Sequence, residues 1–183
     1  PSRYNALLND EQRAFCRSIY QFKQGDIHGI EFFKTCMNAL QLKKRPYHIM
    51  FMPCSNWIKY GQRFKRLDWY IGKHRQDLTS GLYDVDICDA RESLHEAKGG
   101  EKRILERNYL ITGNIKGKEI IIIDDVLTTG QSVADYKEEI ERCGGKVVAA
   151  IFYGKTFSMP SMLLVQIHIW GNHIAHIIER MTK

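Results

Sequence analysis

Hydrophobic positions along the chain recur at two different spacings, and stretches of the two kinds alternate. Near the N-terminus, apolar residues recur at helical spacing behind a cap at Asn9 or Asp10, and they do so again after the break KQGDIHG. The next apolar run, YHIMFMP, has the length of a buried strand, and RFKRLDWYIGKHRQDL has the spacing of an amphipathic helix. The first part of the chain therefore predicts two helices, a strand and a third helix.

The rest of the chain adds further strands, of which KEIIIIDD is the clearest. Its apolar residues do not alternate with polar ones, as expected when helices cover both faces of a parallel sheet. YDVDICDA predicts an earlier strand and KVVAAIFYG a later, buried one, with a helix before the latter that ends at Gly144 and Gly145. The segment 91–118 is polar, charged and interrupted by a Gly-Gly pair, which predicts a long mobile loop.

Strands that alternate with helices predict an α/β fold with a central, mainly parallel sheet flanked by helices. After Pro160 the stretch LLVQIHIW alternates between apolar and polar residues, and a short helix follows it. A chain of 183 residues is long enough for one domain with at most a small attached subdomain.

Composition narrows the class of protein. Hydrophobic residues make up 44% of the chain and no apolar run approaches about 20 residues, so we expect a soluble protein without a membrane segment. The five cysteines follow no disulfide or ligand spacing and no signal peptide is visible, which favours a cytoplasmic protein, although the chain starts at Pro1 and residues upstream are left open. A net charge of +6 suits either nucleic acid or a phosphorylated small molecule, but no base-stacking motif marks a nucleic-acid module.

Most of the candidate chemistry lies in IIIIDDVLTTGQS, residues 120–132. In open parallel sheets, ligands bind beyond the carboxyl ends of the strands, where we expect Asp124 and Asp125. The chain then turns into a helix whose first amides and neighbouring hydroxyls can bind an anion, with Gly130 allowing a close approach. Two acids for ribose hydroxyls beside a phosphate cradle fit a sugar phosphate. The alternative is that the acids only end a strand and Thr-Thr-Gly only makes a turn.

The same stretch resembles the phosphoribosyl-pyrophosphate (PRPP) binding motif of type I phosphoribosyltransferases, with Ser132 where that family has Thr or Ser. The resemblance implies that Asp124 and Asp125, the candidate catalytic residues, hold the 2′- and 3′-hydroxyls of the ribose. The residues implied to hold the 5′-phosphate are Leu127, Thr128, Thr129, Gly130, Gln131 and Ser132. The resemblance also implies Mg²⁺ bound with PRPP, mainly through substrate oxygens and water. We assign no metal ligand to the protein, and this includes the isolated histidines His168, His173 and His176.

The family also places a pyrophosphate-binding loop after its first core strand. The candidate residues of this loop are Cys54, Ser55, Asn56, Lys59 and Arg63. A solvated basic helix face is the alternative interpretation of this cluster. The surrounding sequence looks like the ComF-type branch of the family, but it reads GQRF where that branch reads Gly-Phe-Asn-Gln, and the branch's four-cysteine zinc module is absent from these 183 residues.

A flexible loop that closes over the substrate is a further feature of the family, and RESLHEAKGGEKRILERNYL occupies its place in the sequence. Such a loop excludes water and brings cations to the leaving pyrophosphate. The candidate residues are Arg91, His95, Lys98, Lys102, Arg103 and Arg107. An ordinary solvated loop is the alternative interpretation.

The acceptor in this family is set by a small hood built from terminal segments, and residues 1–45 and 161–183 are the candidates for it around a core of residues 46–160 in one domain, 1–183. The resemblance implies a pentosyl-transferring enzyme that moves ribosyl 5-phosphate from Mg-PRPP to an unidentified acceptor, with nitrogen expected as the nucleophile. The alternative is a non-catalytic sensor of PRPP or nucleotides, linked to DNA uptake or nucleic acid as a ComF-like role would imply. Whether the chain forms a homodimer is left open.

Overall fold

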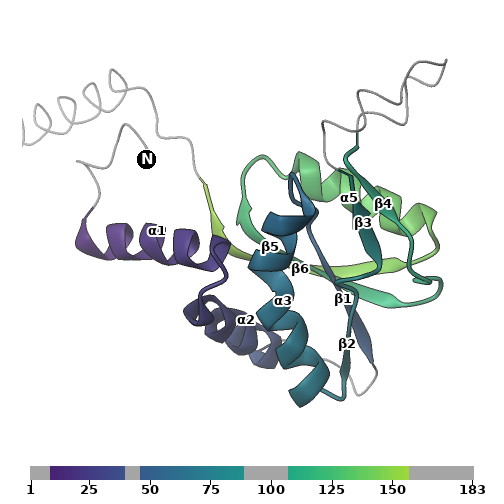
Figure 1. Cartoon of the computed structure of the whole chain (residues 1–183), viewed down its shortest axis with the longest axis horizontal. Coiled ribbons are helices and arrows are strands. Elements are labelled where there is room, and N and C mark those ends of the chain that lie inside the picture. The colour runs from purple at the N-terminus through teal and green to yellow at the C-terminus, as the bar shows by residue number, and fades with distance from the viewer. Residues whose placement is uncertain (1–8, 40–45, 89–106, 157–183) are drawn as a thin grey trace, which may run out of the picture.

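The structure is a computed structural model, and it describes residues 9–39, 46–88 and 107–156 (Figure 1). Two helices come first, and strands then alternate with helices. The elements are α1 (Asp10–Lys23), α2 (Ile27–Ala39), β1 (Tyr47–Phe51), α3 (Trp57–His74), β2 (Leu78–Ser80), β3 (Val85–Ile87), β4 (Tyr109–Ile111), β5 (Glu119–Leu127), α5 (Gln131–Arg142) and β6 (Lys146–Lys155). None of the described helices is long and apolar enough to cross a membrane.

Four strands form a parallel sheet in the order β2-β1-β5-β6, which confirms the predicted α/β fold. Right-handed crossovers from β1 to β2 and from β5 to β6 run in opposite directions, and so place α3 and α5 on opposite faces of the sheet. Figure 1 shows this arrangement, with α1, α2 and α3 grouped on one side and α5 on the other. All five residues of β1 and the isoleucines 120–123 of β5 are buried, because helices cover both faces.

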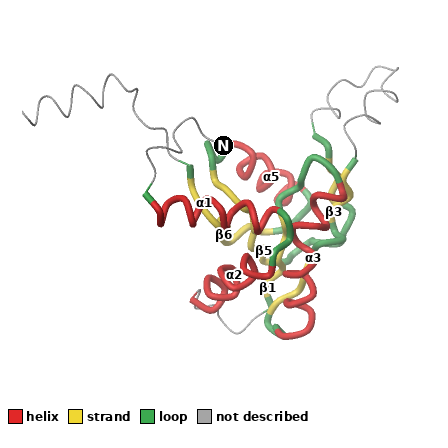
Figure 2. Tube along the Cα trace, turned by 60° about the vertical axis from the view of Figure 1, so that its left-hand side comes forward, coloured by secondary structure: helices red, strands yellow, loops and turns green. Residues whose placement is uncertain are grey.

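The two N-terminal helices pack onto the sheet rather than away from it. A capping box at Asn9 starts α1, as the sequence predicts, and α1 runs across β5 while α2 packs against β6 (Figure 2). Phe22 of α1 and Phe33 of α2 are almost fully buried, and both ring systems contact Tyr153 of β6. The helices and the sheet therefore share one continuous hydrophobic core.

Several predicted boundaries are wrong. The helix predicted to start near Arg63 starts at Trp57, because Asn56 caps it, and it ends at His74, so that Leu78 lies in β2. The segment 91–118, predicted as a loop, contains β4. The strand predicted in YDVDICDA is β3, but it pairs antiparallel with β4 in a separate two-stranded sheet. Local propensity does not reveal which partner a short strand finds.

The strand predicted as buried in KVVAAIFYG is β6, and it is mostly half-exposed. Of its residues only Ile151 is buried. Within the described part of the sheet, β6 is an edge strand, which explains why its solvent-facing residues need no cover. The alternating stretch and short helix predicted after Pro160 lie outside the described residues.

Candidate functional site

The order of the strands creates a topological switch point between β1 and β5. From β1 the chain continues through α3 to β2 on one side, and from β5 it continues through α5 to β6 on the other side. The loops that follow β1 and β5 therefore diverge at the carboxyl edge of the sheet. In open α/β sheets this switch point is where ligands bind. The predicted pyrophosphate loop follows β1 and the predicted phosphate cradle follows β5, so both begin at this switch point.

Asp124 and Asp125 lie inside β5, not at its end as the sequence predicts. The pairing of β5 with β1 stops at Ile123, whereas its pairing with β6 continues to Leu127. Asp124 and Asp125 therefore lie on the part of β5 that extends beyond its pairing with β1. The backbone N–H of Asp125 donates to Oδ1 of Asp124 over 2.7 Å, so the Asp124 side chain provides an acceptor to the backbone beyond the end of β1.

Two cations from different helices contact the acid pair. Nη1 of Arg63, on α3, lies 2.8 Å from Oδ2 of Asp125 and 3.5 Å from Oδ1 of Asp124. Nζ of Lys23, in the last turn of α1, lies 3.3 Å from Oδ2 of Asp125. The Asp125 side chain is only 8% exposed, and a buried carboxylate needs such compensation because it has lost its hydration.

Asp124 is a carboxyl group with a strongly altered acidity. Burial raises its pKa, the neighbouring charge of Asp125 raises it further, and the hydrogen bond from the Asp125 amide and the charges of Arg63 and Lys23 oppose the rise, so that the pKa reaches about 6. Perturbed acids of this kind gather at functional sites because function, not stability, selects their burial. The group therefore changes charge just below neutral pH.

The turn after β5 has the shape of an anion site. Gly130 is the N-cap of α5, with φ of +86°, and has no side chain to cap the helix, while the Gln131 amide donates to Oγ1 of Thr129 over 3.4 Å. Uncapped amides at a helix N-terminus donate readily to an anion. Thr128 and Thr129 are exposed beside them, as are Gln131 and Ser132 in the first turn. The predicted 5′-phosphate residues thus lie at this turn, and Leu127, the last residue of β5, directly precedes it.

Some residues predicted for pyrophosphate binding in the loop after β1 have other contacts in the structure. The Cys54 side chain is buried, and burial raises the pKa of its thiol to about 11, so it faces the core as a neutral group. Oδ1 of Asn56 accepts from the Lys59 amide and caps α3, while Nζ of Lys59 donates to Oγ of Ser55 over 3.3 Å. Arg63, predicted for pyrophosphate, contacts the acid pair. Ser55 and Lys59 are the exposed candidates of this loop.

Most of the predicted flexible loop lies outside the described residues, including Arg91, His95, Lys98, Lys102 and Arg103. Arg107 is described, and its Nη1 lies 2.6 Å from Oε2 of Glu139 on α5. The next residue, Asn108, donates from Nδ2 to the carbonyl oxygen of Cys54 over 2.7 Å. One end of the segment is thus tied both to α5 and to the loop after β1.

Comparison with a protein-family model gives a match for part of the chain. Residues 76–156 match the phosphoribosyl transferase domain. The chain is therefore similar to a phosphoribosyl transferase domain over this part of its length. The matched residues contain the acid pair and the turn at Gly130, whereas Lys23 and Arg63 lie outside them.

The curated proteins that the chain resembles fall into two groups. An orotate phosphoribosyltransferase of Sulfolobus acidocaldarius is 42% identical over 57 residues, which are 31% of this chain and 26% of that protein. The transcriptional regulator GfcR of Methanocella arvoryzae is 30% identical over 98 residues, 54% of this chain and 38% of that protein. A GfcR 1 regulator of Methanosarcina barkeri is 30% identical over 63 residues, 34% of this chain and 29% of that protein. The matches therefore span between about a quarter and two fifths of these relatives.

Proposed function

We propose that the protein is a phosphoribosyltransferase that binds Mg-PRPP and transfers its ribosyl 5-phosphate to an acceptor, with release of pyrophosphate. The observation that carries this proposal is the acid pair on β5, followed in the chain by the N-terminus of α5, where the N-cap is a glycine. The two features lie five residues apart in the chain at one edge of the sheet, so a single sugar phosphate can reach both. The phosphoribosyl transferase domain match supports the same assignment.

The acid pair retains oxygen atoms for a ribose. Among the described residues, the cations and the backbone amide use Oδ1 of Asp124 and Oδ2 of Asp125. We infer that Oδ2 of Asp124 and Oδ1 of Asp125 accept the hydrogen bonds of the 2′- and 3′-hydroxyls. These hydrogen bonds are charge-assisted only when Asp124 is ionised, that is, above its pKa of about 6.

In the reaction, the bond from the ribose C1 to the pyrophosphate oxygen breaks and a bond from C1 to the acceptor nitrogen forms. The proton of that nitrogen leaves to solvent or to a base on the acceptor, and the bonding electrons leave with pyrophosphate. The ring carries positive charge in the transition state, which the nearby carboxylates of Asp124 and Asp125 stabilise. The amides of the turn at Gly130 would hold the 5′-phosphate and so orient the ribose for the reaction.

Mg²⁺ is the cofactor we expect with PRPP, where it would neutralise the leaving pyrophosphate. Magnesium keeps several waters and binds through a few carboxylates and substrate phosphates. The acid pair, already balanced by Arg63 and Lys23, fits a hydrated ion held mainly by substrate oxygens. The described residues hold no group of three or more His, Cys, Asp or Glu side chains arranged for a metal ion.

Calorimetric titration of the whole chain with PRPP and Mg²⁺ tests the donor. We expect the wild type to bind and the double variant Asp124→Asn/Asp125→Asn to bind far more weakly while keeping its fold by circular dichroism. Equal binding of the two proteins would overturn the proposal. A screen of orotate, other bases, amides and ammonia for pyrophosphate release then tests the acceptor, beginning with orotate because of the relative from Sulfolobus.

A second candidate function is a PRPP-responsive regulator that transfers nothing. Two relatives are named as transcriptional regulators, and the net charge of +6 suits nucleic acid. Tight PRPP binding with no pyrophosphate release for any acceptor, together with salt-dependent DNA binding that PRPP alters, would favour this function over the enzyme.

A further inference from the structure

The last turn of α1 brings a cation to the acid pair from outside the part of the chain that matches the phosphoribosyl transferase domain. Nζ of Lys23 lies 3.3 Å from Oδ2 of Asp125, whereas the match covers residues 76–156. Oδ2 of Asp125 is buried and accepts no hydrogen bond of good geometry from the described residues. Its negative charge is therefore stabilised by the charges of Lys23 and Arg63, and the loss of either would leave it poorly compensated.

The end of α1 is held in place by the turn that joins it to α2. Gly25 in this turn has φ of +79°, and a Cβ added to it would overlap the carbonyl oxygen of Gln62 on α3. Nε2 of Gln62 also donates to the carbonyl oxygen of Gln24 over 3.3 Å. On the other side of Lys23, the Phe22 ring is buried in the hydrophobic core. Lys23 is therefore fixed between a buried ring and a turn that packs on α3.

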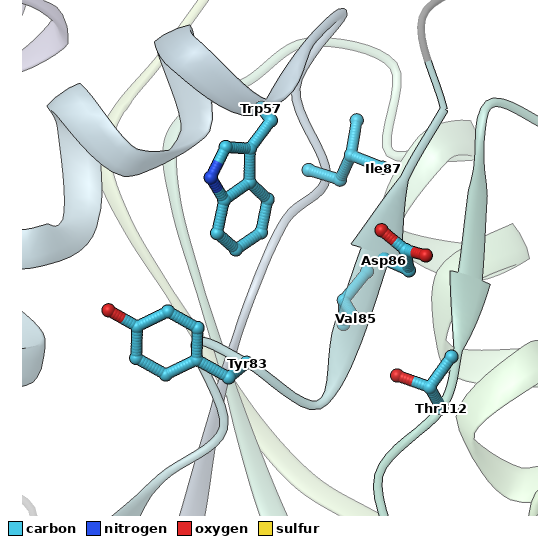
Figure 3. A pocket seen from close by; sticks show the side chains of 6 residues that line it. All are labelled: Trp57, Tyr83, Val85, Asp86, Ile87 and Thr112. Carbon is cyan, nitrogen blue, oxygen red and sulfur yellow. The ribbon is translucent and has the colours of Figure 1, made fainter.

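The second turn of α3 connects this α1–α2 turn to the acid pair. The first turn of α3 contributes Trp57 to an open depression on the surface (Figure 3). In the second turn, Gln62 contacts the α1–α2 turn and the next residue, Arg63, contacts Asp125. One short stretch of α3 thus places both cations, Arg63 directly and Lys23 through the turn.

We infer that Lys23 is a positioning residue of the donor site, and that donor binding is coupled to the packing of α1 across β5. The inference rests on the proposed function, in which Asp124 and Asp125 accept the hydroxyls of the ribose. Lys23 offsets the charge of Asp125 and holds its carboxylate in one orientation, so that the other oxygen is available for a charge-assisted hydrogen bond. A ligand that requires the packed form of α1 must in turn stabilise that form.

Arg63 alone does not replace Lys23. Its Nη1 is shared between Oδ2 of Asp125, at 2.8 Å, and Oδ1 of Asp124, at 3.5 Å. Without Lys23, one guanidinium group would face two adjacent carboxylates that repel each other. The acids would then move relative to each other, and the contacts with the ribose hydroxyls would weaken although neither acid had been changed.

Calorimetric titration of the whole chain with PRPP and Mg²⁺ tests the positioning role. Lys23→Met keeps the length of the side chain but removes its charge, and it should weaken PRPP binding about tenfold, within the usual range for coupled sites. Lys23→Arg should bind within about threefold of the wild type, because arginine restores a charge at this half-exposed contact. Arg17→Met removes a charge at an exposed position of the same helix and should bind as the wild type does.

Gly25→Ala tests the placement of Lys23 with every charge retained. The added Cβ should displace the α1–α2 turn from Gln62, so PRPP binding should weaken as it does in Lys23→Met. Gly117→Ala is the matched control, because Gly117 also has a positive φ, +74°, but nothing lies within 4 Å of its added Cβ. It should leave PRPP binding unchanged.

Hydrogen exchange separates coupling from a simple loss of charge. At PRPP concentrations that saturate both proteins, the amides in the last turn of α1 should exchange more slowly when PRPP binds to the wild type, but not when it binds to Lys23→Met. Circular dichroism and urea unfolding show whether each variant is folded. A purely structural role of Lys23 would lower the stability of the variant and leave this difference in exchange unaltered.

The possible outcomes distinguish this inference from the proposed function. A wild type that does not bind PRPP would overturn both. A wild type that binds PRPP, with Lys23→Met losing no more affinity than Arg17→Met, would overturn the inference alone. The inference is also wrong if Lys23→Arg binds as weakly as Lys23→Met, or if PRPP leaves exchange in the last turn of α1 unchanged in the wild type.

Discussion

At the scale of single residues, the site is governed by how two adjacent carboxylates are kept in a buried position. Asp125 is compensated by Arg63 and Lys23, while Asp124 keeps a pKa of about 6. Burial of these acids opposes folding, and binding of the proposed sugar phosphate would give their position on β5 a function. Two predictions follow from this balance.

Asp124→Asn should make the protein more stable above neutral pH. The pKa of Asp124 is about 6 in the folded protein against 3.8 without burial, so the folded state binds more protons between these values and the wild type loses stability as pH rises from about 4 to 6. A shift of about two units corresponds to about 3 kcal/mol, and asparagine keeps the Oδ1 acceptor for the Asp125 amide. Urea unfolding should show a gain of about 1–3 kcal/mol at pH 8 that shrinks towards pH 4.

Asp86→Asn makes the same change at an exposed position and serves as the control, and it should change the free energy of unfolding by less than about 0.5 kcal/mol at pH 8. A less stable Asp124→Asn at pH 8 would mean that burial does not dominate the acidity of Asp124.

Arg63→Met should destabilise the fold, because it leaves Asp125 buried with Lys23 as its remaining cation. Breaking one side of a buried ion pair costs about 3–5 kcal/mol, and partial exposure reduces this to about 2–4 kcal/mol here. Arg66→Met makes the same charge change at an exposed position of α3 and should stay within about 0.5 kcal/mol. Urea unfolding at pH 7 compares the two, and equal losses would contradict the role of Arg63.

Sequence patterns identify some of these residues and miss others. Asp124, Asp125 and Gly130 can be predicted from the sequence because they lie within one short stretch and their expected roles depend on neighbouring residues. The contact of Lys23 with Asp125 cannot be predicted from the sequence, because it depends on how α1 packs across the sheet. The sequence predicts Arg63 as a binding cation, but not its contact with the acid pair. That contact depends on which face of α3 packs towards β5, and periodicity does not identify that face.

At the scale of elements, the turn from β5 to α5 depends on a single backbone conformation. Gly130 has φ of +86°, and a Cβ added there would lie 3.8 Å from Cδ1 of Leu127, so space is available and the strain is conformational. Gly130→Ala should therefore cost about 1–2 kcal/mol and weaken PRPP binding, measured by thermal unfolding and calorimetry.

Gly72→Ala is the matched control for this substitution. Gly72 lies within α3 with nothing within 4 Å of an added Cβ, so alanine should stabilise the helix by about 0.5–1 kcal/mol. Destabilisation by both substitutions to a similar extent would show that the conformation of Gly130 is not what matters.

Elements with strong periodicity are predicted from sequence, and short ones are not. β1, β5, α1 and α5 follow from apolar runs or helical spacing with caps, and each is present in the structure. β3 and β4 have three residues each, and their antiparallel pairing joins segments on either side of residues 89–106. Such pairing depends on tertiary contacts, for example that of the Tyr109 ring with the Tyr136 ring of α5.

At the scale of the whole molecule, the N-terminal helices complete the core and the site together. Phe22 of α1 is 1% exposed and packs on Phe33, Phe64 and Tyr153. The next residue, Lys23, contacts Asp125. The predicted division of a hood, 1–45, from a core, 46–160, stays a prediction as a functional boundary, but α1 and α2 share the hydrophobic core with the sheet.

Phe22→Ala should cost about 3–5 kcal/mol, because it removes a buried aromatic ring at the junction of α1, α2, α3 and β6. Phe15→Ala on the same helix is the control; its ring is 46% exposed, and its loss should cost about 1 kcal/mol. Both are measured by urea unfolding monitored by circular dichroism. A small effect of Phe22→Ala would mean that α1 is not part of the cooperative unit.

The hydrogen bond from the Asp125 amide to Oδ1 of Asp124 limits which amino acids position 124 can accept. The acceptor oxygen must reach the amide of the next residue. It does so when it is bonded to Cγ, as in aspartate and asparagine. Glutamate has the same charge but places its oxygens one methylene farther out. The negative charge of the side chain and the distance of its oxygen from the backbone are therefore separate requirements at position 124. Aspartate meets both.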